Sequence, residues 1–220
     1  MFNFGNKLET KCKITIIGDA NCGKTSLKNG IEIFKKTDYQ FNKRYKATTD
    51  DERKTMKVLS NVNDKETEFT VYFHDTVGQE KLTDYDRSTR LDTMKGSDAF
   101  IILYDVMNDQ SFKNIMSWID EINIISKNVP VLILGNKMDM LKNTNQKEIE
   151  LKKLERLNIP IHFSAGLISV KRNEFYGKEV NMGFIFGIPQ NKIFKKGMLI
   201  PFEYLLSKIN SKNIDLRNYN

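Results

Sequence analysis

Short apolar runs alternate with longer amphipathic stretches along the chain. The apolar runs are almost continuous, as in strands buried on both faces of a parallel sheet, and they cover residues 14–17, 69–73, 99–104, 131–134 and 161–163. Three segments between them carry apolar residues every three or four positions, as amphipathic helices do: residues 25–34, 111–125 and 146–157. Strands alternating with helices predict an open, doubly wound α/β sheet with helices on both faces.

Two further elements complete the predicted fold. Residues 56–61 and 68–73 flank the turn-forming pair Asn63-Asp64, which predicts a hairpin that adds one antiparallel edge strand. The sheet is then mainly parallel and six-stranded. Residues 201–209 begin with Pro201 and keep apolar residues on one face, which predicts a last helix. Ser111 is expected to cap the helix at 111–125.

Composition indicates one globular domain over residues 1–220. The chain has 220 residues, of which 40% are hydrophobic and 29% charged, too apolar for a disordered protein. Its apolar runs are far shorter than the roughly 20 residues of a membrane-spanning helix. We expect a cytoplasmic protein.

The net charge of +7 comes entirely from the last third of the chain. Residues 1–140 contain 21 basic and 21 acidic residues, whereas residues 141–220 contain 14 and 7. We recognise no nucleic-acid-binding fold or clustered basic helix there, so we expect no nucleic-acid partner and at most peripheral membrane contact. Cys12 and Cys22 are the only cysteines, which excludes a disulfide framework and leaves no cysteine near the C-terminus for prenylation.

The first motif lies between the strand at 14–17 and the helix at 25–34. Its sequence is Gly18-Asp19-Ala20-Asn21-Cys22-Gly23-Lys24-Thr25, which matches the phosphate-binding P-loop pattern. In such a loop, backbone amides surround phosphates, Lys24 reaches the outer phosphates and the Thr25 hydroxyl can bind Mg²⁺. A P-loop alone is compatible with kinases, ATPases and GTPases.

Three more motifs each follow a predicted strand. They are Asp75-Thr76-Val77-Gly78-Gln79-Glu80 after 69–73, Asn136-Lys137-Met138-Asp139 after 131–134, and Ser164-Ala165-Gly166 after 161–163. Ligands of such sheets bind at the carboxyl ends of strands. The Asp139 carboxylate can accept two hydrogen bonds, which suits the N1 and N2 donors of guanine, whereas adenine lacks such a pair.

In order, spacing and strand context, these motifs resemble the five G-box motifs of Ras-superfamily GTPases, closest to the Rab branch. The resemblance covers roughly residues 12–166 and implies a P-loop NTPase G domain that binds GTP or GDP with Mg²⁺. It implies catalytic roles for Gln79, which orients the attacking water, and for Lys24. Metal binding is implied for Thr25, for Thr48 and, through a water, for Asp75.

The resemblance also implies a set of nucleotide-binding residues. They are Asp19, Ala20, Asn21, Cys22, Gly23, Lys24, Thr25, Ser26, Phe41, Thr48, Gly78, Asn136, Lys137, Asp139, Ser164, Ala165 and Gly166. Asn136 is expected to brace the loop, Lys137 to cover the ring, and the Ala165 amide to meet the guanine oxygen. The assignment of Thr48 rests on its spacing from Tyr45. The alternative is that Thr48 is an ordinary solvated threonine of the loop. We expect the Cys22 thiol to be inert, although a helix terminus can lower a thiol pKa.

The chain departs from the Rab pattern in two places. After Thr48 it reads Thr49-Asp50-Asp51-Glu52-Arg53, where a Rab has an apolar surface that effectors read. Between Gly166 and Pro201 there are 34 residues where the family needs few. We expect residues 167–199 to be an ordered insert with a hairpin through 184–188, because the segment is too aromatic for a plain linker.

The resulting hypothesis is a monomeric GTP-hydrolysing switch with slow intrinsic turnover, connected with vesicle trafficking. Its partners would be an exchange factor, an activating protein and effectors. The alternative is a non-cycling GTP-binding module that mimics a Rab to engage its regulators.

Overall fold

The structure of the chain is a computed structural model. It describes residues 8–30, 52–62, 65–75, 84–157, 163–177 and 192–195, together with residues 201–202, 205–206 and 208–209.

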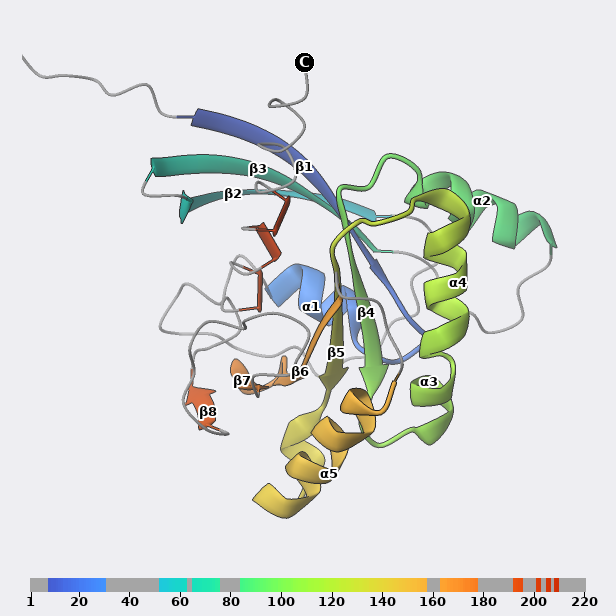
Figure 1. Ribbon diagram of the computed structural model, residues 1–220, viewed down its shortest axis with the longest axis vertical. Coiled ribbons are helices and arrows are strands. Elements are labelled where there is room, and N and C mark those ends of the chain that lie inside the picture. Colours follow the sequence, from blue (N-terminus) through green and yellow to red (C-terminus); the bar gives the residue numbers. More distant parts are fainter. Residues whose placement is uncertain are drawn as a thin grey trace, which may run out of the picture.

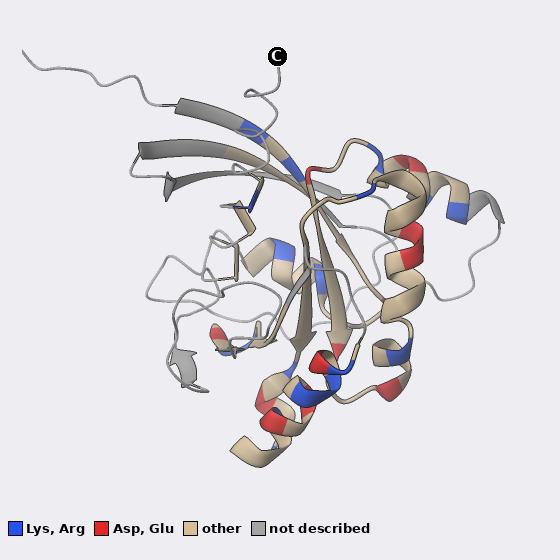
Figure 2. Ribbon diagram, viewed as in Figure 1, with Lys and Arg blue, Asp and Glu red and all other residues tan. Residues whose placement is uncertain are grey.

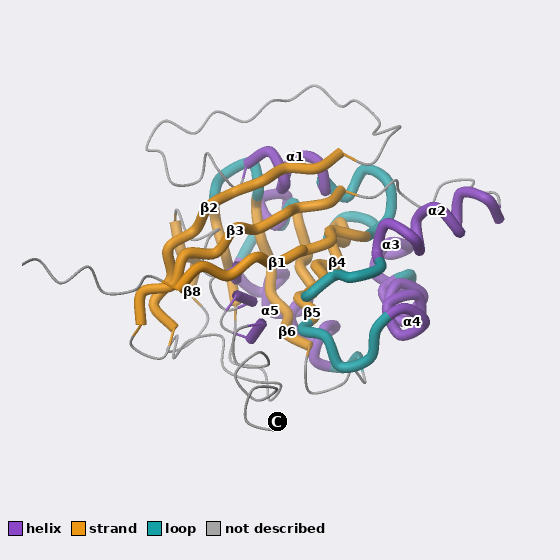
Figure 3. The backbone as a smooth tube through the Cα atoms, turned by 90° about the horizontal axis from the view of Figure 1, so that it is seen from above, coloured by secondary structure: helices purple, strands orange, loops and turns teal. Residues whose placement is uncertain are grey.

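A single eight-stranded sheet forms the centre of the described structure (Figure 1). Its strands are β1 Leu8–Ile17, β2 Glu52–Val62, β3 Lys65–Asp75, β4 Ala99–Asp105, β5 Val131–Asn136, β6 Phe163–Ser169, β7 Glu174–Gly177 and β8 Lys192–Lys195. Their order across the sheet is β2-β3-β1-β4-β5-β6-β7-β8. Figure 3 shows β2, β3, β1 and β4 as successive neighbours. Strands β3, β1, β4, β5 and β6 run parallel, and β2 pairs antiparallel with β3. The predicted six-stranded, mainly parallel sheet is confirmed, and β7 and β8 extend it antiparallel.

Helices cover both faces of the sheet. They are α1 Lys24–Gly30, α2 Asp84–Met94, α3 Asp109–Lys113, α4 Ile115–Ile125 and α5 Thr144–Glu155, with a short 3₁₀ turn η2 at Met138–Met140. Every described residue between Pro201 and Ile209 is also helical, as the apolar spacing predicts. Within the described residues, no helix is long and apolar enough to cross a membrane.

Alternation along the central strands divides the core into two layers. On β4, Ile101 and Leu103 pack with α1 and the 201–209 segment, while Phe100 and Ile102 pack with α4 and α5. Each of these side chains is at most 1% exposed. Both faces of β4 are therefore buried, which explains why its sequence is continuously apolar.

The helix expected over 111–125 is divided at Asn114. Asn108, and not Ser111, is the N-cap of α3, and its side-chain oxygen accepts from the backbone N–H groups of Gln110 and Ser111. The prediction of a Ser111 cap is therefore wrong. The Ser111 hydroxyl instead binds the backbone of Asp105 at the end of β4. Asn108 lies three residues earlier and can place its oxygen over the first free amides.

Three elements have no counterpart in the sequence-based expectations, namely α2, β7 and β8. Strand β7 pairs with β6 from Leu167 to Ser169, and β8 pairs with β7. Part of the segment after β6 is thus ordered, although the hairpin predicted at 184–188 lies outside the described residues. Charges of both signs are interspersed on α5 (Figure 2), where Lys153 pairs with Glu150 at 2.6 Å.

Candidate functional site

The loop between β1 and α1 has backbone angles that few residues adopt. Gly18 has a φ of +139°, and a Cβ there would lie 2.0 Å from the carbonyl oxygen of Leu103 on β4. Gly23 has a φ of +94°, and a Cβ there would lie 2.4 Å from Nδ2 of Asn136. Only glycine fits both positions without moving β4 or the end of β5. Asn21, at φ 60°, is of a type that tolerates the left-handed region.

Lys24 closes the loop from the first turn of α1. Its side chain is buried, and Nζ donates to the carbonyl oxygens of Gly18 and Asp19, each at 2.9 Å. The positive charge of the ammonium group is thus held at the loop, next to the backbone amides of the loop. Thr25 and Ser26 follow in α1 and are partly buried.

Asn136, at the end of β5, connects this loop to the turn after β6. Its Nδ2 donates to the carbonyl oxygen of Cys22 at 2.9 Å, and its Oδ1 accepts from the backbone N–H of Val170 at 3.2 Å. Both bonds are buried, and Asn136 itself is 4% exposed. One amide side chain therefore fixes the spacing between two loops at the same edge of the sheet.

Lys137 and Asp139 lie in the turn that follows. Lys137 has a φ of +65°, and its Nζ lies 2.6 Å from Oδ2 of Asp105 at the end of β4. The Asp139 side chain is only 5% exposed; its Oδ1 accepts from the Ser169 hydroxyl at 2.7 Å, and its Oδ2 lies 3.7 Å from Nζ of Lys171. The Asp139 carboxylate is held in a fixed orientation by these contacts.

Residues Ser164, Ala165 and Gly166 do not lie at the end of a strand. They lie within β6, paired with residues 132–134 of β5, and Ala165 is 2% exposed. A Cβ on Gly166 would lie 2.6 Å from the ring of Phe175, so this position packs against β7. The expected loop position is therefore wrong. The strand continues because Leu167 and Ile168 are apolar and fully buried.

The residues at the carboxyl end of β6 are Ser169, Val170 and Lys171. Ser169 binds the Asp139 carboxylate and Val170 binds Asn136, so this turn contacts the loop after β5 twice. Sequence reasoning missed it because the Ser164-Ala165 pair matched the motif first. The apolar pair at 167–168 is the signal that extends the strand to Ser169.

Burial controls the chemistry of the Cys22 thiol. Cys22 is fully buried. Burial, with smaller contributions from Asp19 and Asp105, raises its pKa to about 11, against opposing effects of Lys24 and a hydrogen bond from Ser111. The thiol is therefore protonated at neutral pH, as the expectation of an inert residue requires.

The Asp19 carboxylate is engaged by two donors from the α3–α4 region. Asn114 donates Nδ2–H to one oxygen at 2.7 Å, and Trp118 donates its indole N–H to the other at 2.9 Å. Trp118 is 1% exposed. Nothing local in the sequence reveals this hydrogen bond, because it joins residues 99 positions apart.

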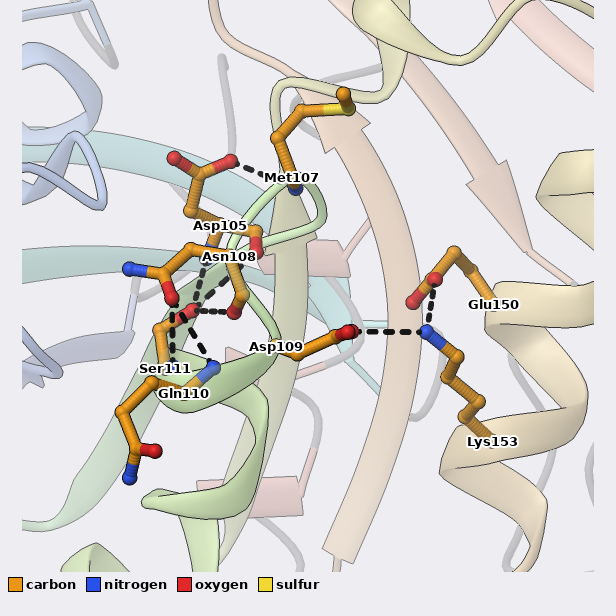
Figure 4. Close-up of polar contacts among 8 residues, drawn as sticks. All are labelled: Asp105, Met107, Asn108, Asp109, Gln110, Ser111, Glu150 and Lys153. Carbon is orange, nitrogen blue, oxygen red and sulfur yellow. Dashed lines mark hydrogen bonds and ion pairs between the residues drawn. The ribbon is translucent and has the colours of Figure 1, made fainter.

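The segment after β4 holds Asp105 in place for Lys137. The Ser111 hydroxyl contacts both the backbone N–H and the carbonyl of Asp105, and it also donates to the carbonyl of Asn108 at 2.7 Å (Figure 4). In the same view, Lys153 of α5 pairs with Asp109 of α3 and with Glu150. Helices α3 and α5 are thereby joined beside the turns that follow β4 and β5.

Of the remaining expected site residues, only Asp75 lies in the described part of the chain. Asp75 ends β3 and pairs in register with Ile16 of β1, next to the P-loop. Phe41, Thr48, Gly78 and Gln79 lie outside the described residues. The described part of the site thus consists of the loops after β1, β4, β5 and β6, with Asp75 ending β3 at the same edge.

Known proteins match this chain in the segment that builds the site. The model of the Ras family matches residues 13–176. The Ypt/Rab-type GTPase Rab7 of Neurospora crassa is 36% identical over 133 residues, which are 58% of each chain. Ras-related protein Rab-7a of Dictyostelium discoideum is 29% identical over 204 residues, 84% of this chain and 91% of that protein. The Rho-related GTP-binding protein RhoF of Homo sapiens is 32% identical over 157 residues, 70% of this chain and 66% of that protein.

These matches agree with the P-loop geometry and the sheet order. The chain spans 58% of the length of the first curated relatives that it matches. The family match alone covers far more than half of the chain, from β1 to β7. The chain therefore belongs to the Ras family, with Rab proteins among the relatives that it resembles.

Proposed function

We propose that the protein is a Rab-like molecular switch that binds GTP and GDP with Mg²⁺ and hydrolyses GTP to GDP. The observation that carries the proposal is the junction made by Asn136, which joins the P-loop to the turns around Asp139 and Val170. A single ligand at this edge would meet phosphate-binding and base-binding groups together.

Phosphate binding rests on the loop between Gly18 and Thr25. Its backbone amides, with the Lys24 ammonium held beside the carbonyls of Gly18 and Asp19, form a concentration of donors and positive charge. On binding, Lys24 would exchange a carbonyl partner for a phosphate oxygen. Ala20, Asn21, Cys22, Gly23 and Ser26 would contribute mainly through their backbone.

Guanine selection rests on Asp139. Its carboxylate is 5% exposed and oriented by Ser169, so it can accept from N1 and N2 of guanine without reorganising. Adenine lacks this donor pair, so its binding would cover the carboxylate without those two hydrogen bonds, which is costly. We propose that a backbone N–H of the turn 169–171 meets the guanine oxygen, in place of Ala165. Lys137 would cover one face of the ring.

The donor chemistry around the loop fits Mg²⁺. Thr25 supplies a hydroxyl, and Asp75 ends the strand next to β1; oxygen ligands of this kind suit Mg²⁺, which commonly retains waters and phosphate oxygens. Thr48 is proposed as the further ligand. When bound, the ion neutralises charge on the β- and γ-phosphates.

Hydrolysis is proposed to depend on Gln79, which would orient the attacking water. Intrinsic turnover is expected to be slow, because the arginine that neutralises transition-state charge is supplied by a partner in many such proteins and contributes about 10³–10⁵ in rate. Thr48 and Gly78 would respond to the γ-phosphate, and Phe41 would pack near the guanine. An exchange factor, an activating protein and effectors would then act on a monomer in vesicle trafficking.

The test of this mechanism is Gln79→Leu. Leucine cannot hold a water, so single-turnover GTP hydrolysis should fall by at least about tenfold while GTP affinity stays within about twofold. Hydrolysis is measured by phosphate release from preloaded protein. An unchanged hydrolysis rate would remove Gln79 from the mechanism.

A second candidate, a non-cycling GTP-binding module that mimics a Rab, is favoured by the acidic segment 50–52 after Thr48. Comparing GTP hydrolysis with and without a Rab-type activating protein separates the two. Acceleration supports a cycling switch. Tight binding of the activating protein without acceleration supports the mimic.

The domain organisation is also a proposal. We propose that residues 1–220 form one G domain with an insert at 167–199, in which β7 and β8 widen the sheet beyond β6. Support comes from the pairing of β7 with residues 167–169 and of β8 with β7.

A further inference from the structure

An aspartate within a phosphate-binding loop needs restraint. The Asp19 carboxylate lies in the loop whose amides and Lys24 would attract phosphates, and its own charge opposes theirs. Both of its oxygens are taken by donors from the α3–α4 region, Nδ2 of Asn114 at 2.7 Å and Nε1 of Trp118 at 2.9 Å. These two bonds hold the charge on the α4 side of the loop.

The same indole ring contacts α2. The guanidinium carbon of Arg90 lies 4.8 Å from the centroid of the Trp118 ring, a cation–π distance. Arg90 is fixed by Glu121 of α4: its Nε donates to one carboxylate oxygen at 3.0 Å and its Nη2 to the other. Arg90 and Glu121 are 5% and 3% exposed, so this bidentate pair is shielded from water.

Trp118 therefore touches both the P-loop and α2. Its N–H binds the P-loop, and its face receives the one arginine of α2 that is buried among the described residues. Helix α2 begins at Asp84, shortly after Gln79 in the sequence. A displacement of α2 would move Arg90 on the ring and shift the angle of the indole N–H toward Asp19.

We propose that Trp118 is a positioning residue that couples the placement of α2 to the phosphate-binding loop. A change in the position of the Arg90–Glu121 pair acts on the indole ring, and the indole N–H transmits it to Asp19. The proposal rests on the proposed function, because its effect is on guanine-nucleotide release. Loss of the indole bond frees the Asp19 carboxylate to approach the phosphates and speeds release.

A double-mutant cycle tests the coupling. Trp118→Phe keeps an aromatic face for Arg90 but removes the N–H donor. Arg90→Met with Glu121→Met replaces the ion pair by apolar side chains, so that no unpaired charge is left buried. The dissociation rate of fluorescently labelled GDP is measured for the wild-type protein, Trp118→Phe, the Met pair, and the combination.

Trp118→Phe should release GDP about tenfold faster, the effect of losing one hydrogen bond to a charged group. The Met pair should also change the GDP dissociation rate. The combined variant should match Trp118→Phe alone, because without the indole N–H the ion pair can no longer act on Asp19. Multiplication of the two effects, or an unchanged rate in Trp118→Phe, overturns the proposal. If the wild-type protein retains no guanine nucleotide, the proposed function fails instead.

The dependence of Trp118 fluorescence on the bound nucleotide gives a second readout. Trp118 is the only tryptophan in the chain, so emission reports this site directly. Emission should differ between protein loaded with GDP and protein loaded with a non-hydrolysable GTP analogue, and the Met pair should abolish the difference. Retention of the full difference in a folded Met-pair protein contradicts the coupling.

Discussion

At the scale of single residues, the site depends on a few side chains that connect loops distant in sequence. Asn136 binds the backbone of both Cys22 and Val170, and Ser169 binds Asp139. None of these bonds lies within one loop. Their loss should therefore affect nucleotide release more than folding.

Ser169 supplies the first residue-scale prediction. Ser169→Ala removes the hydroxyl that orients Asp139, so GDP should dissociate about tenfold faster. Ser164→Ala is the matched control, because Ser164 lies within β6 and away from its carboxyl end. The dissociation rate of labelled GDP measures both. A larger effect at Ser164 than at Ser169 would restore the assignment to residues 164–166.

The second residue-scale prediction concerns the reactivity of the two thiols. Burial raises the pKa of Cys22 to about 11 and that of Cys12 to about 12, from an ordinary value of 9.0. At pH 8 both thiols should resist alkylation in the folded protein and react once it is unfolded. Because the folded pKa values are raised, stability should fall as pH rises from about 9 toward 11–12.

Mass spectrometry of the alkylated peptides distinguishes the two cysteines. Rapid modification of Cys22 at pH 8 in folded protein would mean that the helix terminus outweighs burial at this position.

The position of a loop was predictable from sequence where its pattern is local. The P-loop pattern from Gly18 to Thr25 locates the loop because its glycines are required by the close approach of Leu103 and Asn136. Other contacts could not be predicted. Trp118 reaches Asp19 across 99 positions, and the turn after β6 depends on where that strand ends.

At the scale of elements, the apolar runs located β1, β3, β4 and β5, whereas the run at 161–163 reaches only the first residue of β6. The continuous apolar sequence of β4 and β5 follows from burial of both their faces. Helix α2 has no apolar stripe in Asp84–Met94 and escaped prediction. It packs through Leu91 and Met94 and through the buried pair of Arg90 with Glu121. Strands β7 and β8 escaped because four-residue strands carry too little periodicity.

Gly166 tests whether β7 packs on β6 as described. In Gly166→Ala, the new Cβ would lie 2.6 Å from the ring of Phe175, which is fully buried. The free energy of unfolding should fall by about 1–3 kcal/mol, as overpacked cores do. Chemical denaturation measures the change.

Phe175→Leu provides the compensating change. On its own it should destabilise the protein, but combined with Gly166→Ala it should cost less than the sum of the two, because it removes the clashing ring. Simple additivity would place Phe175 away from Gly166.

At the scale of the whole molecule, one sheet brings the candidate groups to a common edge. Strands β1, β3, β4, β5 and β6 are parallel neighbours, so the residues that follow them converge although they are spread from Gly18 to Lys171. The family match over residues 13–176 covers this convergence. Strand β8 lies beyond that match.

The central claim is guanine-nucleotide binding at this edge, and the nucleotide bound to the purified protein tests it most directly. The protein is purified in Mg²⁺, denatured, and the released nucleotide is identified by chromatography and mass spectrometry. Asp139→Ala, which removes the proposed guanine acceptor, serves as the comparison. The account predicts GDP or GTP in the wild-type protein and at least about a hundredfold weaker GDP binding in Asp139→Ala. Adenine nucleotide in the wild-type protein, or GDP binding unaffected by Asp139→Ala, would contradict it.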